Sequence, residues 1–121
     1  MNIEDQVCSP ELSHILKNFE VKQESYFVWV RNILIPRLSA MELDQHAFFQ
    51  CLFSAAFTSA ELGEMLPEEV DTFKGNRDWK WECSFHRGNN YHNKSGANIE
   101  ADARAKMLIF LLENNLMEVP K

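Results

Sequence analysis

Glycine and proline are scarce in this sequence, with four of each among 121 residues. Disordered chains are typically rich in such residues and poor in apolar ones, whereas 45% of this chain is hydrophobic. A chain of this length buries roughly two-thirds of the surface that it exposes when unfolded, so it can fold without a metal or a disulfide. The sequence therefore predicts a single globular domain over residues 1–121.

The sequence also contains few cysteines and no long apolar run. The three cysteines lie far apart and include no C-x-x-C pair, which argues against a disulfide framework. The longest uninterrupted apolar run is Met107–Leu112, far below the roughly 20 residues that span a bilayer. Glu4 and Asp5 stand where a secretory signal peptide has positive charge and an apolar stretch. We therefore expect a cytoplasmic protein without a membrane partner.

Basic residues are the minority, with 12 Lys and Arg against 18 Asp and Glu and a net charge of −6. This balance argues against non-specific binding of the whole domain to nucleic acid or to an anionic membrane. The charges are unevenly distributed, because residues 38–73 contain seven acids and no Lys or Arg, whereas residues 74–106 contain seven bases and four acids. The chain thus combines an acidic middle region with a basic later region.

Three segments have helical signals. Ser9 and Pro10 suit the cap and first position of a helix that ends near residues 18–20, with a predicted apolar face of Leu12, Ile15, Leu16 and Phe19. Thr58 and Glu61 have capping-box spacing and open a short helix that stops before Pro67. A last helix is expected over 99–114, with Asn98 as its cap and an apolar stripe of Ala101, Ala105, Leu108 and Leu112.

Four segments have strand signals. Residues 25–30 are mostly aromatic or β-branched and apolar on both faces, which predicts an interior strand or a strand that is covered on each side. Further strands are expected over 47–54, 69–74 and 79–86, and alternation in the last predicts a core face of Trp79, Trp81, Cys83 and Phe85. A turn is expected at 32–37, at most one helical turn at 39–42, and a polar loop over 87–97.

The element order that follows, α-β-β-α-β-β-α, predicts an α+β fold. In such a fold an antiparallel sheet, here of about four strands, is flanked by helices that pack on it. Helix follows strand without a long linker, and no internal repeat divides the chain. The sequence therefore predicts one core.

Four blocks of the sequence resemble a pattern in small uncharacterised proteins of phages and prophages from gut and related bacteria. The blocks are Cys8-Ser9-x-Glu11-Leu12, residues 21–25, residues 56–67 and residues 100–109. The resemblance implies a mobile-element origin and a helix–sheet–helix fold, and it implies no activity and no site residue. The last helix also resembles that of phage "ABA sandwich" domains. Residues 31–45 depart from the pattern, because they are partly apolar where a polar connection is expected.

One group of residues has the side-chain types of a metal site. Cys83, His86 and His92 offer the thiolate and imidazole ligands that zinc prefers. On a regular strand, however, Cys83 and His86 point to opposite faces, and no fourth ligand is evident. The simpler interpretation is a core cysteine beside a surface histidine, so we expect no metal.

Catalytic and phosphate-binding patterns are weak. Cys51 has His46 and Asp44 nearby, but no nucleophile elbow or oxyanion loop accompanies it, and core packing accounts for a free cysteine. Gly88-Asn89-Asn90 is consistent with a small anion nest, although most such loops are only turns. We therefore expect no cofactor and no enzymatic activity.

A basic–aromatic stretch over 77–94 interleaves cations with rings, a composition that suits phosphate contacts and base stacking. Its candidate binding residues are Arg77, Lys80, His86, Arg87, Tyr91, His92 and Lys94. Strand alternation also accounts for the tryptophans there as core and leaves the bases as solvated surface. Both interpretations stay open.

An acidic block precedes that stretch and consists of Glu61, Glu64, Glu68, Glu69 and Asp71. Such a block is able to imitate a phosphate backbone and occupy a basic site on a host protein, or it is the solvated surface of a capped helix and its turn. The first interpretation makes these five acids a partner surface.

These observations together predict a non-catalytic accessory protein of phage or prophage origin that binds a host or phage macromolecule, in the first place a protein. The alternative is a small nucleic-acid- or nucleotide-binding module that uses residues 77–94. Met107–Leu112 is apolar on every side, so one flank of the last helix is expected to meet either the rest of the core or a second subunit. We favour a homodimer through this helix, with Phe110 facing outward.

Overall fold

A computed structural model describes residues 2–30, 32–37, 53–75, 78–88 and 91–120 of the chain. Its strands form two antiparallel sheets of three strands each, in the orders β2-β1-β3 and β4-β5-β6. The predicted α+β class, with antiparallel strands flanked by helices, is confirmed, although the strands are divided between two sheets. The elements are η1 (Ile3–Asp5), α1 (Pro10–Asn18), β1 (Phe27–Val30), β2 (Ile33–Pro36), β3 (Phe53–Ala55), α4 (Ser59–Met65), β4 (Val70–Lys74), β5 (Trp81–Arg87), β6 (Tyr91–Ala97) and α5 (Glu100–Glu113).

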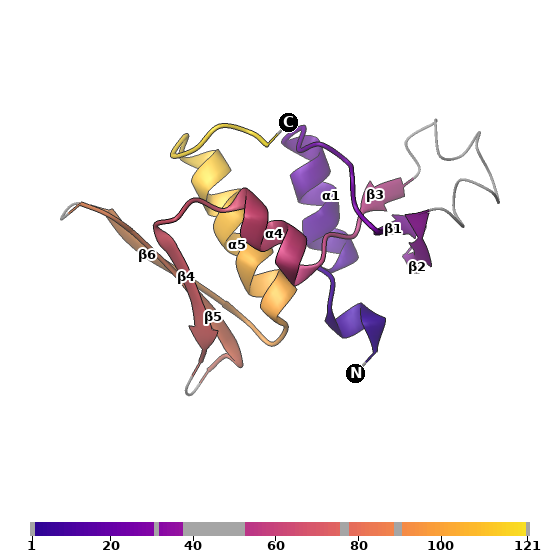
Figure 1. Cartoon of the computed structure of the whole chain (residues 1–121), viewed down its shortest axis with the longest axis horizontal. Helices are drawn as coiled ribbons and strands as arrows, with labels where there is room; N and C mark the ends of the chain where they lie inside the picture. The colour runs from indigo at the N-terminus through magenta and orange to yellow at the C-terminus, as the bar shows by residue number, and fades with distance from the viewer. Residues whose placement is uncertain (1, 31, 38–52, 76–77, 89–90, 121) are drawn as a thin grey trace.

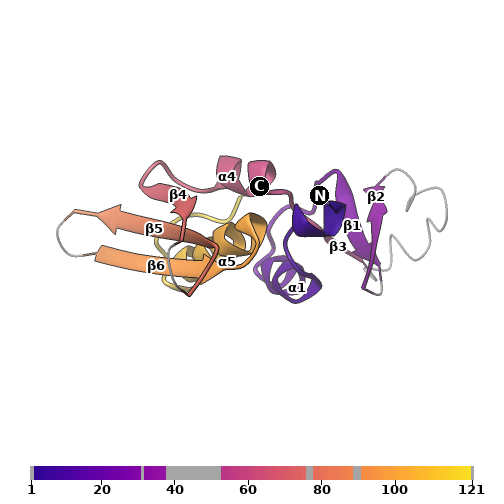
Figure 2. The same cartoon turned by 90° about the horizontal axis from the view of Figure 1, so that it is seen from below.

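The last helix, α5, occupies the centre of the molecule. The sheet β4-β5-β6 lies against one side of it, α1 and α4 lie against the other, and the small sheet β2-β1-β3 lies beyond α1 (Figures 1 and 2). We call the side of α5 that meets α1 and α4 the helix flank, and the side that meets β4-β5-β6 the sheet flank. The two flanks face two separate clusters of buried apolar side chains.

Burial on both flanks accounts for the apolar composition of α5. On the helix flank the predicted stripe of Ala101, Ala105, Leu108 and Leu112 is buried with residues that include Leu16 and Leu62. On the sheet flank Ala103, Met107 and Leu111 are buried with Cys83 and Phe85, and half-buried Phe110 packs against them. The helix is therefore covered by its own chain, which is one of the two alternatives that its sequence left open. The expectation that Phe110 faces outward is wrong.

Of the three α-helices within the described residues, two begin with the cap that the sequence predicts. Ser9 caps α1 by accepting the Leu12 N–H, and Thr58 and Glu61 form the reciprocal capping box of α4. For α5 the prediction of Asn98 as the cap is wrong. Ile99 holds that position without a side-chain bond, and its carbonyl accepts the Ala103 N–H at 3.1 Å. The β6 strand ends at Ala97, so the chain completes its turn one residue later than Asn98.

The segment 32–37, predicted as a turn, is instead the strand β2. Asn32 has a φ of 67°, which lets the chain reverse tightly so that Val30 pairs with Ile33 and Phe27 with Pro36. Pro36 is tolerated because it ends a strand whose described neighbour is β1 alone.

The prediction that β1 is an interior strand is confirmed. Of the strand expected over 47–54 only the end lies within the described residues, as part of β3, and the expected turn at 39–42 lies outside them.

The segment 87–97, predicted as a polar loop, contains the strand β6. It pairs with β5 from Arg87↔Tyr91 to Trp81↔Ala97. Gly88, with a φ of 63°, begins the connection, and the polar residues after it form a strand because only alternate ones face α5. Ser95 is one of these, since its hydroxyl donates to the Ala103 carbonyl.

The predicted core face of the β5 region is confirmed in part. Cys83 and Phe85 are fully buried and Trp81 is half-buried, but Trp79 precedes the strand and is 43% exposed. Its indole lies against the backbone of Gly96, where a Cβ atom would overlap the ring. Placing Trp79 in the core was wrong because strict alternation applies only within the strand, which begins at Trp81.

Candidate functional site

The two faces of β4-β5-β6 differ in what covers them. Cys83 and Phe85 of β5 and Ser95 of β6 point toward α5, so the alternate residues point away from it. Among the described elements, helices cover the first face only, and the second face lies open on the side away from α5 (Figure 1). We call this second face the outer face, and its described side chains are Asp71, Phe73, Glu82, Ser84, His86 and Lys94.

The basic–aromatic stretch is divided between these two faces. His86 and Lys94 lie on the outer face and are exposed, whereas Arg87 is on the face toward α5, and Lys80 precedes β5. Tyr91 and His92 stand at register positions opposite Arg87 and His86. Arg77 lies outside the described residues. The described cations of the stretch are therefore divided between the two faces of the sheet and the segment before β5.

Arg87 joins the predicted basic set to the predicted acidic set. Its Nε donates to a Glu69 carboxylate oxygen at 2.7 Å, its Nη1 donates to the Leu116 carbonyl at 2.8 Å, and its guanidinium lies 5.2 Å from the centre of the Phe85 ring. The hydrogen bond from Arg87 lowers the pKa of Glu69. Two of the predicted site residues thus neutralise each other within the chain.

The remaining acids are dispersed. Glu61 caps α4, with a carboxylate oxygen 2.9 Å from the Thr58 nitrogen. Glu61 and Glu64 line a shallow cleft of about 480 Å³ together with Glu24 and Glu118, whereas Asp71 lies on the outer face of β4. Glu68 is exposed in the turn before β4. The five acids therefore do not form a single surface that imitates a phosphate backbone.

An aromatic–cation contact closes one edge of the sheet. Lys106 of α5 donates to the Gly96 carbonyl at 2.9 Å, and the same ammonium group lies 4.9 Å from the centre of the Trp79 ring. A strand edge with unpaired backbone groups invites pairing with other chains, and lysines commonly block it. Trp79 and Lys106 together cover this part of β6 and place an exposed indole beside the outer face.

A cavity of about 750 Å³ lies where four segments converge. The N-terminal segment forms one wall, held by backbone hydrogen bonds from Cys8 to Phe57 and from Ser59 to Gln6. The start of β5 and the entries to α4 and α5 form the others. Its lining is Asp5, Gln6, Thr58, Ser59, Ala60, Lys80, Trp81, Asn98, Ile99 and Glu100. The volume falls within the range of small-ligand sites, and sequence periodicity gave no sign of this convergence.

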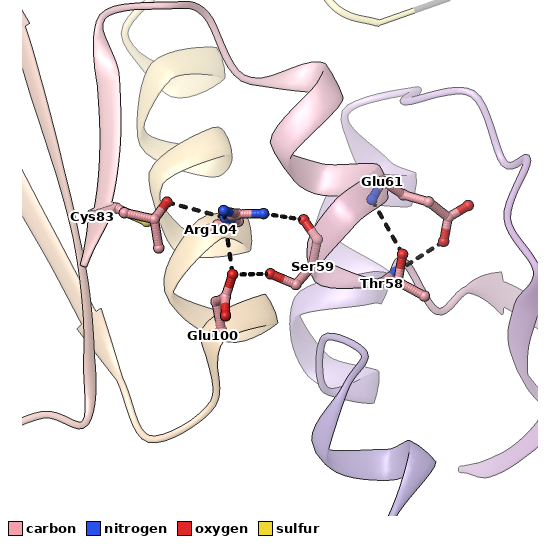
Figure 3. A network of polar contacts seen from close by, with 7 residues as sticks. Thr58, Ser59, Glu61, Cys83, Glu100 and Arg104 are labelled. Atoms are coloured by element: carbon pink, nitrogen blue, oxygen red, sulfur yellow. Dashed lines mark hydrogen bonds and ion pairs between the residues drawn. The ribbon is translucent and has the colours of Figure 1, made fainter. Parts of the chain in front are cut away.

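A polar network fixes one wall of that cavity (Figure 3). Arg104 of α5 donates to the Ser59 carbonyl at 2.6 Å and to the Thr72 hydroxyl at 3.0 Å, and it forms an ion pair with Glu100 at 3.2 Å. The Ser59 hydroxyl donates to the same Glu100 carboxylate at 2.6 Å. Arg104 thereby ties α5 to both α4 and β4, and its bonds hold Glu100 in place rather than leaving it available for a ligand.

The described cysteines are buried. Desolvation raises the pKa of Cys8 to about 11 and also raises the pKa of Cys83, whose sulfur lies 3.4 Å from the Thr72 hydroxyl. Reactive cysteines have lowered pKa values and access to solvent, and these two have neither. Cys83 and His86 occupy opposite faces of β5, as predicted. Cys51, His46 and Asp44 lie outside the described residues. Among those that are described, no group of three or more His, Cys, Asp and Glu is placed to hold a metal ion.

Comparison with known proteins identifies no relative of this chain. No family model matches the chain, and no curated protein or solved structure is significantly similar to it. The resemblance to phage proteins therefore stays a prediction. Within the described ranges, no helix is long and apolar enough to cross a membrane.

Proposed function

We propose that this protein is a non-catalytic binding protein and that it contacts a partner protein through the outer face of β4-β5-β6. The observation that carries the proposal is that helices cover one face of this sheet and leave the other open (Figure 2). Two large aromatic side chains stand on or beside the open face, Phe73 with 39% and Trp79 with 43% exposure. Aromatic residues are enriched at protein interfaces and dominate their binding energy.

The charges on the outer face favour a protein over a nucleic acid. Asp71 and Glu82 stand on the same face as His86 and Lys94, and carboxylates there repel a phosphate backbone. Arg87 is already paired with Glu69. A mixed set of charges around exposed rings resembles the rim and core of a protein interface more than a phosphate-binding track.

Affinity capture from a bacterial lysate, with Phe73→Glu as the test variant, examines the proposal. The matched control is Tyr26→Glu, because Tyr26 is the more exposed aromatic at 75% and precedes β1, in a different sheet. We expect the wild type and the control to retain a partner that Phe73→Glu loses, while all three proteins have the same circular dichroism spectrum. Capture that is unaffected by Phe73→Glu would contradict a role for the outer face.

The cavity supports a second candidate function, the binding of a nucleotide. Lys80 and Trp81, both from the basic–aromatic stretch, line it and supply a cation for phosphate and a ring for stacking. The carboxylate of Asp5 in the same lining disfavours an anionic ligand, and for this reason nucleotide binding is the second candidate. Calorimetric titration with AMP and with adenosine tests this candidate. Binding that weakens in Lys80→Glu supports a nucleotide site, and the absence of binding heat with both compounds would rule the site out.

A cytoplasmic phage or prophage accessory role completes the proposal. It is supported by the sequence blocks that resemble phage proteins. The gene neighbourhood tests it directly, because flanking integrase, tail or lysis genes are expected for a mobile element. A neighbourhood of housekeeping genes in several genomes would count against this origin.

A further inference from the structure

We propose that residues 2–5 form a lid over the cavity at the starts of α4, β5 and α5, and that an ion pair of Asp5 with Lys80 latches the lid over an uncharged ligand of the nucleoside class. The inference rests on the second candidate function, since it takes this cavity to be a ligand site. It adds how the cavity closes and which ligand the closed cavity accepts.

The lid is weakly anchored to the rest of the chain. All of residues 2–6 are exposed, and the 3-10 turn η1 buries none of its residues. Its backbone hydrogen bonds, from Asp5 to the Asn2 carbonyl and from Gln6 to the Ile3 carbonyl, stay within the turn. Figure 1 shows the turn at the end of the molecule where α5 begins. A segment with few buried contacts opens at little cost in free energy, so this turn can move as a unit.

The residues that follow the lid are held firmly, which gives the movement a defined hinge. Cys8 is fully buried, its N–H donates to the Phe57 carbonyl at 3.0 Å, and its carbonyl accepts the indole N–H of Trp29 at 2.8 Å. Gln6 stands between the two parts, and its carbonyl accepts the Ser59 N–H at 3.2 Å. Rotation about the backbone of Gln6 therefore moves the lid and leaves the contacts of Cys8 intact.

The lid and the segment before β5 bring unpaired opposite charges to the same cavity. Asp5 and Lys80 both line it, and both residues are exposed. Among the described residues, neither has an ion-pair partner within 4.0 Å. Glu100, the other charged residue of the lining, is already bound to Arg104 and Ser59. A movement of the lid toward Lys80 brings the two free charges together and is therefore favoured by their attraction.

The latch determines which charge of ligand the closed cavity accepts. With the latch formed, every charged group of the lining has a partner, so an anionic phosphate must compete with Asp5 for Lys80. The uncharged groups include the half-buried ring of Trp81 and the side-chain amides of Gln6 and Asn98, which supply a stacking surface and hydrogen-bond donors and acceptors. These groups suit a flat, uncharged heterocycle with polar edges, which is the chemistry of a nucleoside. The closed cavity is therefore expected to favour adenosine over AMP.

Calorimetric titration of the full chain with adenosine and with AMP, at low salt, is the test of the latch. Asp5→Asn removes the latch and frees Lys80 for phosphate, so it should weaken adenosine binding about twofold to fivefold, as the loss of an exposed ion pair does, and strengthen AMP binding. The double variant Asp5→Lys, Lys80→Asp restores the pair with reversed charges and should recover adenosine binding. Glu4→Gln, which removes a neighbouring charge of the lid outside the cavity lining, is the control and should match the wild type.

Hydrogen exchange followed by NMR tests the movement of the lid separately. In the free protein the amides of Asp5 and Gln6 should exchange at least about tenfold faster than the amide of Cys8, because the lid opens locally while Cys8 stays buried. Saturating adenosine should slow the exchange of Asp5 and Gln6 in the wild type, and should slow it less in Asp5→Asn.

Two results would overturn the inference: an Asp5→Asn variant that binds adenosine and AMP with wild-type affinities, or lid amides that exchange as slowly as that of Cys8 in the free protein. Adenosine binding with the first result would keep the ligand site and end its latch. No binding heat with either compound would end both the site and the lid, while the Phe73-dependent capture would still decide the protein partner. Circular dichroism of each variant separates a lost latch from a lost fold.

Discussion

The helix flank and the sheet flank of α5 both bury apolar side chains, but they differ in their polar contacts. On the helix flank, Asp102 accepts the Ser9 N–H at 2.7 Å in a partly buried setting that raises the pKa of its carboxyl group through desolvation. On the sheet flank, the ion pair of Arg87 and Glu69 is exposed to solvent. Apolar packing therefore stabilises both flanks, whereas the polar contacts range from a partly buried carboxyl group, whose desolvation is costly, to a solvated ion pair that is nearly neutral in energy.

The largest effects are expected from removing one buried side chain on each flank. Phe85→Ala on the sheet flank should lower the free energy of unfolding by about 3–5 kcal/mol, and Leu108→Ala on the helix flank by about 2–5 kcal/mol, since both side chains are fully buried. Urea denaturation measures both. If either variant were as stable as the wild type, the two flanks would not form equivalent parts of one core.

Arg104 connects the two flanks through polar contacts, and its loss is expected to have the next largest effect. Arg104→Met keeps the aliphatic length but removes the bonds to Ser59, Thr72 and Glu100, which should cost about 1–3 kcal/mol because partly buried acceptors lose their donors. Thermal unfolding measures the loss. Arg104→Lys is the informative control, because a lysine keeps the charge but lacks the planar fork that reaches three partners, so it should restore little stability.

The carboxyl group of Asp102 makes the stability of the helix flank depend on pH. Its raised pKa means that the folded state favours the protonated form, so the stability it contributes is present below the unfolded pKa near 3.8 and is lost as the pH rises through the folded value. Asp102→Asn keeps an oxygen for the Ser9 N–H without the charge. We expect this variant to match the wild type near pH 3 and to become more stable than it toward pH 7. Equal pH profiles from thermal melts would contradict this account.

The smallest effect is expected at the exposed ion pair of the sheet flank. Glu69→Gln removes the charge that Arg87 pairs with, but both groups are solvated, so the unfolding midpoint at neutral pH should hardly change. Because Arg87 lowers the pKa of Glu69, any contribution of this pair is present above the unfolded pKa of about 4.5 and is lost as the pH falls. A large loss of stability at neutral pH would show that the sheet flank depends on this pair.

Features that depend on near neighbours in the chain could be predicted from the sequence. The caps at Ser9 and Thr58, the interior position of β1 and the apolar stripe of α5 all follow from residues within one or two turns or strand lengths. The strand β6 was missed because its residues are polar and follow a glycine–asparagine turn, and polar strands are permitted when only one face is covered. For the candidate site, the sequence did not indicate how the predicted residues are distributed, because the strand register divides them between two faces of one sheet.

The apolar pattern of each element, including the burial of α5 on more than one side, could be inferred from the sequence, because hydrophobic periodicity indicates which positions are buried. The contacts that each position makes became known from the three-dimensional arrangement. This arrangement placed Trp79 on Gly96 rather than in the core, paired Arg87 with Glu69, and brought Arg104 to Ser59 across more than 40 residues. This is because the burial of a residue follows from the hydrophobic pattern around its own position. A contact depends on two residues, and the sequence between them does not indicate which two residues come together.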